Sequence, residues 1–212
     1  MKFDQLLEIV GDEPLFDTGL LLAGAVDPAD VRRQLARWTR TGRLHRLRRG
    51  LYALAPPYRR HAPHPFLVAN RLVPGSYVSG LSALAHAQRI PEYVPEVTSV
   101  AAARPELRST ALGRFSFRHL KGDLLFGYRC VEVGRHQQAF VARPEKALLD
   151  LVHLCPGGDE SAHLAGLRLD LDALDLDLME RLAATAARPK LRRAARRVRA
   201  MAGDQADVCE VL

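Results

Sequence analysis

Arginine is the residue type whose placement in this sequence most clearly suggests chemistry. Ten arginines lie between residues 32 and 60, a stretch without a single acid, whereas residues 1–30 hold seven acids and one lysine. Guanidinium groups stay charged, and their fixed fork of donors matches both a phosphate and the major-groove edge of guanine. This segregation of charge predicts a small N-terminal module with one positive face that binds a polyanion.

The remaining composition narrows the possible partners and cofactors. A net charge of +7 over 212 residues agrees with a nucleic-acid partner. No run approaches the roughly 20 apolar residues of a membrane span. Asp4 and Glu8 lie where a signal peptide is apolar, so we expect a cytoplasmic protein with no membrane partner. The three cysteines are widely spaced and His61 and His64 lack a third ligand, so neither a metal nor another cofactor is expected.

A helix over residues 27–40 is predicted to hold the central arginines. Asp27 can cap its first turn, and Pro28 suits the first helical position. One side of this helix is apolar at helical spacing: Val31, Leu35 and Trp38. Three arginines fall on the opposite side: Arg33, Arg37 and Arg40. Two shorter helices are predicted before it, at residues 3–10 and 18–23, which gives the order of a helix-turn-helix with a major-groove recognition helix.

A basic hairpin is predicted directly after this helix, over residues 43–54. Its turn is expected at Arg48, Arg49 and Gly50, because glycine tolerates a positive φ. Such a hairpin is the wing of a winged helix, and its arginines are expected to follow phosphates or enter the minor groove. The candidate DNA contacts of the whole module are Arg32, Arg33, Gln34, Arg37, Arg40, Arg43, Arg46, Arg48 and Arg49.

The rest of the chain predicts a larger domain, and the fold class is α+β. Helical patterns are expected at residues 66–72, 82–86 and 144–153, and strands at 77–79, 97–102, 113–118, 128–133 and 138–141. The predicted organisation is a winged helix-turn-helix at residues 1–56, a proline-rich linker at 57–65, a mixed α/β domain at 66–202 and a flexible tail at 203–212.

Several short blocks resemble the AbiEi antitoxins of the abortive-infection AbiE family, collinearly over roughly residues 15–155. The blocks cover residues 50–58, 79–84, 90–92, 97–100, 112–119, 126–128 and 143–150. The resemblance implies a two-domain antitoxin whose winged helix binds inverted repeats in its own promoter and represses it. It also implies that the C-terminal domain neutralises a nucleotidyltransferase toxin without a stable complex, and that the chain is a monomer in solution or a dimer on DNA.

A nuclease-like or RNA-binding enzyme built on the C-terminal domain is the alternative. Such a nuclease needs clustered carboxylates and a lysine around a metal. Asp123 and Glu132 have strand-like settings, but Gly134 stands where the lysine is needed, and Glu145 at a helix start is explained as a dipole partner. We therefore predict no catalytic residue and no enzyme activity. A winged helix used for protein contact is a third, weaker possibility.

A second basic segment follows near the C-terminus. It includes Arg192, Arg193, Arg196 and Arg197, which flank an apolar seam on a predicted helix. This helix is either a possible second basic surface for nucleic acid or an acidic partner, or a docked helix with solvated arginines.

Overall fold

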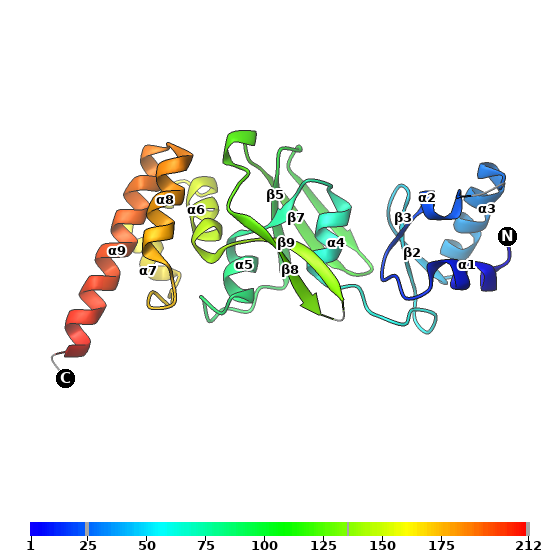
Figure 1. The fold of residues 1–212 in the computed structure, drawn as a ribbon, viewed down its shortest axis with the longest axis horizontal. Helices are drawn as coiled ribbons and strands as arrows, with labels where there is room; N and C mark the ends of the chain where they lie inside the picture. Colours follow the sequence, from blue (N-terminus) through cyan, green and yellow to red (C-terminus); the bar gives the residue numbers. More distant parts are fainter. Residues whose placement is uncertain (24–25, 135, 211–212) are drawn as a thin grey trace.

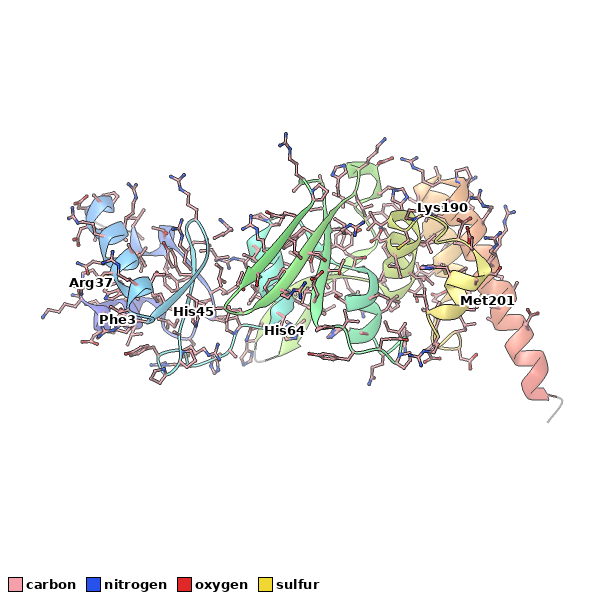
Figure 2. The ribbon with its side chains drawn as sticks, turned by 180° about the vertical axis from the view of Figure 1, so that it is seen from behind. Phe3, Arg37, His45, His64, Lys190 and Met201 are labelled. Atoms are coloured by element: carbon pink, nitrogen blue, oxygen red, sulfur yellow. The ribbon has the colours of Figure 1, made fainter. Side chains whose placement is uncertain are left out.

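The computed structural model describes residues 1–23, 26–134 and 136–210, except for the side chains of residues 205–210. The fold is α+β, as predicted. An N-terminal module of helices and a small sheet lies at one end of an elongated molecule, a larger sheet lies in the middle, and a group of helices lies at the other end (Figure 1). Figure 2 shows Phe3 and Arg37 at one end, and Lys190 and Met201 at the other.

The N-terminal module packs three helices on a three-stranded sheet. Its elements are α1 (Phe3–Val10), β1 (Phe16–Asp17), α2 (Thr18–Leu21), α3 (Pro28–Arg40), β2 (Leu44–Arg48) and β3 (Leu51–Leu54). The strand order is β1-β3-β2, and both pairings are antiparallel. The predicted start of α3 is confirmed, because the Asp27 carboxylate accepts hydrogen bonds from the backbone N–H groups of Ala29 (2.9 Å) and Asp30 (3.3 Å).

The module has its own apolar core. Trp38 of α3 is 1% exposed and meets Phe3 of α1 edge to face, with the ring centroids 5.3 Å apart. Val31 and Leu35 are buried in the same cluster, as their helical spacing predicted. The other side of the hairpin packs elsewhere, since Leu47 and Leu51 belong to the apolar cluster of the larger domain. The module therefore rests on the body through its hairpin.

The body is built on a six-stranded mixed sheet. Its strands are β4 (Tyr77–Val78), β5 (Glu96–Ala101), β6 (Glu106–Thr110), β7 (Gly113–His119), β8 (Tyr128–Gly134) and β9 (Gln137–Ala142), in the order β6-β7-β5-β4-β9-β8. The β4–β9 and β5–β7 pairs are parallel, and the other pairs are antiparallel. β6 was not predicted, because its short polar sequence lacks the alternation that marks a half-buried strand.

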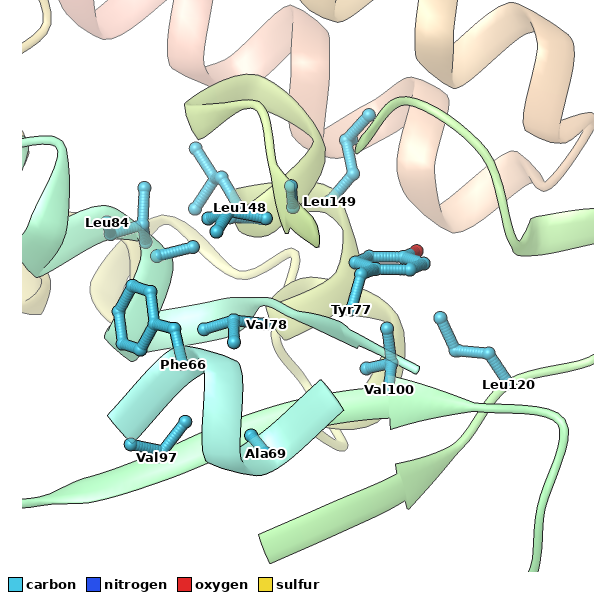
Figure 3. Packing of buried hydrophobic residues seen from close by; sticks show 14 of the residues in the cluster. Phe66, Ala69, Tyr77, Val78, Leu84, Val97, Val100, Leu120, Leu148 and Leu149 are labelled. Atoms are coloured by element: carbon cyan, nitrogen blue, oxygen red, sulfur yellow. The ribbon is translucent and has the colours of Figure 1, made fainter. Parts of the chain in front are cut away.

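Helices cover both faces of this sheet. They are α4 (Pro65–Leu72), α5 (Gly80–His86) and α6 (Pro144–Leu154). Figure 1 shows α4 on one side and α5 with α6 on the other. The two residues of β4 point to opposite faces of the sheet and pack on different helices, because side chains alternate along a strand. Figure 3 shows Val78 among the side chains of α4, whereas the Tyr77 hydroxyl contacts Asp150 of α6.

The far end of the molecule is helical. It comprises α7 (Ser161–Gly166), α8 (Leu176–Ala186) and α9 (Pro189–Glu210). The short 3-10 turn η1 (Gly122–Leu124) lies earlier in the chain, between β7 and β8. α8 and α9 pack on each other and on α6. α9 continues to Glu210, so a helix occupies most of the segment for which a flexible tail was expected. In the part of the chain that the structure describes, no helix has the length and apolar character needed to cross a bilayer.

Candidate nucleic-acid interface

A groove of about 710 Å³ lies between α2, α3 and the β2–β3 hairpin. Its lining is Thr18, Leu22, Arg32, Ala36, Thr39, Arg40, Arg46, Arg49, Gly50 and Tyr52. Gly50 has φ +81°, which allows the tight turn, and its carbonyl accepts a hydrogen bond from the Thr18 backbone N–H (2.8 Å). This bond joins the tip of the hairpin to the start of α2.

Four arginines line the groove, two on each wall. Arg32 and Arg40 come from α3, and Arg46 and Arg49 come from the hairpin. All four are exposed, and none of them lies within ion-pair distance of an acid among the described residues. A concave surface with unpaired charges of one sign concentrates its electrostatic field. The groove is therefore a positively charged channel with an apolar floor.

The arginines predicted to lie together on α3 separate in the structure. Arg32, Ala36 and Arg40 recur every four residues and share the side of the helix that faces the hairpin. Arg33 lies outside the groove, where its guanidinium is 3.4 Å from Asp30 and 4.0 Å from Asp27 in the first turn. Arg37 is exposed on the surface of α3 away from the core (Figure 2). Of the three predicted arginines, Arg40 therefore lines the groove, Arg37 lies on the outer surface of α3, and Arg33 is paired with acids.

Two other predicted contacts face the interior of the module. Gln34 is half-buried, and its Oε1 atom is buried without a hydrogen-bond partner among the described residues. The guanidinium carbon of Arg43 lies 4.9 Å from the centroid of the Phe3 ring, in a cation–π contact. Neither side chain lines the groove.

Arg48, also predicted as a DNA contact on the wing, does not line the groove and is turned toward the body. Its Nε donates a hydrogen bond to the Arg71 carbonyl (3.0 Å), and its guanidinium is 3.9 Å from Asp17. Arg71 also donates to Asp17. The reason is a bulge: the strand register shifts between Arg46 and Arg48, so two residues that would share a face point to opposite sides.

If the groove binds duplex DNA, Arg48→Ala should affect stability and not DNA affinity. The variant loses a charge-assisted hydrogen bond at a half-buried position, so the free energy of unfolding should fall by about 1 kcal/mol. Urea unfolding measures this change, and fluorescence anisotropy with labelled duplex DNA measures affinity. Arg49→Ala, one residue along and exposed in the groove, is the matched control and should show the reverse pattern. Equal losses of DNA affinity in both variants would contradict this assignment.

The second basic surface is partly neutralised in the structure. Arg193 and Arg197 both pair with Asp159, at 2.9 Å and 3.7 Å. Arg192 donates a long hydrogen bond to the Ala184 carbonyl (3.5 Å), and Arg196 is exposed. Asp159 lies before α7, so the charge pattern of α9 alone could not reveal this pairing. This surface differs from the groove, where the arginines have no acidic neighbours.

The carboxylates considered for a nuclease do not form a metal site. Asp123 pairs with Arg188 (2.6 Å), and Glu132 lies on the edge strand β8. Among the described residues, no three His, Cys, Asp or Glu side chains are grouped so that they could hold a metal ion. Glu145 accepts a hydrogen bond from the Asp175 backbone N–H (3.0 Å), which ties α6 to the start of α8.

A buried polar centre joins α6 to β4, and the sequence patterns did not identify it. Lys146 donates to the Tyr77 hydroxyl (3.0 Å) and to Asp150, while Ser79 (2.7 Å) and Tyr77 (3.0 Å) donate to the other oxygen of Asp150. All four residues are at most 3% exposed. Burial raises the pKa of Asp150 and lowers the pKa of Lys146, and each partner opposes the shift of the other. The signal available was the i,i+4 spacing of Lys146 and Asp150 within a helix whose other residues are mostly apolar.

This centre has no room for a substrate. The adjacent cavity measures about 10 Å³ and is lined in part by Phe126, Lys146 and His153. That volume is roughly the least that can hold a single water molecule. Gly127 (φ +73°) packs directly on Lys146, since a Cβ atom there would lie 3.1 Å from its Cγ. We therefore assign these residues to stability and place the candidate functional site in the arginine-lined groove.

The fold can be compared with those of known proteins. It is similar to that of the RV2827C protein from Mycobacterium tuberculosis. The crystal structure of RV2827C superposes with a TM-score of 0.54 over 93% of this chain and 79% of its own, at 17% sequence identity. At this identity, RV2827C supports the fold and not a function. No family model matches the chain, and no curated protein sequence matches it.

Proposed function

We propose that residues 1–56 are a winged helix-turn-helix that binds duplex DNA, and that the chain is a DNA-binding antitoxin that represses its own promoter. The observation that carries the first part is the groove with Arg32 and Arg40 on one wall and Arg46 and Arg49 on the other, all exposed and without acidic neighbours. The order helix, strand, helix, helix, strand, strand is that of a winged helix.

The groove suits one strand of a duplex. With α3 in the major groove, the sugar–phosphate strand that borders it lies between α3 and the hairpin, within reach of arginines on both sides. Arg49 sits next to the turn of the hairpin and faces the phosphates or the minor groove beyond that strand. Arg37, on the outer surface of α3, then faces the base edges, where an arginine reads guanine through O6 and N7.

The antitoxin part of the proposal is supported by the AbiEi resemblance over roughly residues 15–155. It predicts binding to inverted repeats upstream of the gene and neutralisation of a nucleotidyltransferase toxin encoded beside it. Co-expression of the two neighbouring genes tests this part: the toxin gene alone should arrest growth, and this chain should restore it. Restoration by the chain without residues 1–56 would place neutralisation in the C-terminal domain.

Arg37→Ala tests the proposed DNA binding and the role of α3 in it. We expect the variant to lose about 1–3 kcal/mol of affinity for the promoter sequence and little for random duplex DNA, because a base-reading arginine carries specificity. Fluorescence anisotropy with the upstream fragment and a scrambled fragment, at several salt concentrations, measures both affinities. If the parent protein shows no salt-sensitive binding to either fragment, the proposed function is wrong.

A further inference from the structure

Tyr93 is the most exposed large apolar side chain among the described residues, at 89%. It lies between Pro91 and Pro95 in the loop that leads from α5 to β5. Arg168 holds this loop in place, since its Nε (3.0 Å) and Nη2 (2.6 Å) both donate to one oxygen of Glu92. An exposed tyrosine is a typical anchor of a protein–protein interface, because its ring buries a large apolar area while only two side-chain torsions lose freedom.

A hollow of about 400 Å³ opens directly beside Tyr93, which forms part of its rim. Its apolar lining includes Phe66 of α4, Val97 of β5 and Leu112 of the turn before β7, of which Leu112 is the most exposed. His86 of α5, which is exposed, adds a polar group to the same hollow. An apolar pocket with a few polar groups suits a tyrosine, whose ring is apolar and whose hydroxyl needs a hydrogen-bond partner.

The exposed Tyr93 ring and the hollow beside it form one surface patch. The shape of this patch is complementary to that of the same patch on a second copy of the chain. In a two-fold symmetric contact, each copy offers the same surface, so the knob of one subunit meets the hollow of the other, twice. We propose that this chain self-associates through its body, with Tyr93 of each copy inserted into the hollow beside Tyr93 of the other. The hollow and the tyrosine are adjacent, which is the arrangement that such a contact requires.

The charges around the patch favour a second copy over a nucleic acid. Three ion pairs surround Tyr93: Arg168 with Glu92 (2.6 Å), Arg89 with Asp170 (3.7 Å) and Arg114 with Glu96 (3.4 Å). The patch therefore carries equal numbers of both signs. Two identical neutral patches meet without like-charge repulsion, whereas a polyanion gains nothing from such a surface. The groove is the opposite case, because its four arginines make no ion pair among the described residues.

This contact goes beyond the proposed function but bears on it. Recognition of an inverted repeat places two N-terminal modules on one DNA molecule, and a contact between the bodies would hold the two copies together. That link rests on the proposed function, whereas self-association through Tyr93 does not. Experiments on the protein without DNA therefore test the contact separately.

Sedimentation equilibrium of the full chain, up to about 1 mM, tests the contact, because even millimolar affinities are detectable there. We expect a monomer–dimer equilibrium for the parent protein, and at least about a tenfold weaker association for Tyr93→Ala. Leu107→Ala is the matched control, since Leu107 is a 63% exposed apolar residue on the edge strand β6. Its association should equal that of the parent.

A mixing experiment tests the geometry of the contact. Ala85 lines the hollow, and Ala85→Trp should fill it, so that this variant also fails to associate. A mixture of Tyr93→Ala, which keeps its hollow, and Ala85→Trp, which keeps its tyrosine, restores one of the two contacts. The mixture should therefore associate more strongly than either variant alone.

Circular dichroism checks that each variant is folded. If Ala85→Trp unfolds, Leu112→Glu replaces it, because it places a charge on the wall of the hollow. The proposal is overturned if the parent stays monomeric throughout the concentration range, if Tyr93→Ala associates like the parent, or if the mixture associates no better than its components. Failure to bind DNA, in contrast, leaves these results unchanged and counts only against the proposed function.

Discussion

Replacing Lys146 by Met is expected to lower the free energy of unfolding by about 3–5 kcal/mol, because it leaves Asp150 buried without its cation. Asp150 is 3% exposed, and only the Ser79 and Tyr77 hydroxyls would still donate to it. Methionine has nearly the length of lysine, so the loss reports the uncompensated charge more than a cavity. Urea unfolding at pH 7, followed by far-UV circular dichroism, measures the change.

The double variant Lys146→Met with Asp150→Leu is the control for this result. It removes both charges together, and replacement of a whole buried ion pair by apolar residues is often close to neutral. Some loss should remain, because Ser79 and Tyr77 then lack an acceptor. We expect the double variant to recover at least half of the stability that the single variant loses. A single variant within about 1 kcal/mol of the parent would show that the pair contributes little to folding.

Replacing Arg40 and Arg49 together by Ala should weaken binding to duplex DNA roughly 100-fold, if each loses a charge-assisted hydrogen bond of about 1.5 kcal/mol. The two residues stand on opposite walls of the groove. Because both are assigned to phosphates, the loss should be similar for promoter and random DNA. The slope of log K against log salt should also fall by about 2. Anisotropy titrations between 50 and 200 mM salt measure both quantities.

Arg33→Ala is the matched control for the groove variant. Arg33 lies on the same helix and carries the same charge, but it faces Asp27 and Asp30 and not the groove. We expect its DNA affinity to stay within about threefold of the parent, about the effect of one surface charge. If Arg33→Ala weakens binding as much as the double variant does, net charge and not the groove determines affinity.

Local sequence signals predicted α3 and several elements of the body. Asp27 and Pro28 mark the start of α3 through backbone groups that only neighbouring residues can satisfy, and the apolar spacing of Leu35 and Trp38 fixed its buried side. β7 and α6 lie within one residue of their predicted bounds, because alternation and a proline start are local features. The polar edge strand β6 carries no such signal.

The orientation of individual arginines could not be predicted in the same way. The bulge before Arg48 reverses the side to which that residue points, and a two-residue alternation gives no sign of it. Arg193 and Arg197 are paired by Asp159, which is distant in sequence. Arg33 differs from these, because its acidic neighbours, Asp27 and Asp30, lie in the first turn of its own helix.

The amino-acid sequence by itself determined where the positive charge lies, which helix carries it and which side of that helix is buried. These are properties of neighbouring residues and of helical periodicity. The tertiary structure decided which arginines line a common groove, which are neutralised, and that Lys146, Asp150, Tyr77 and Ser79 share one buried centre. The physical reason is that charges and hydrogen-bond partners interact through space over a few ångströms, whatever their separation along the chain.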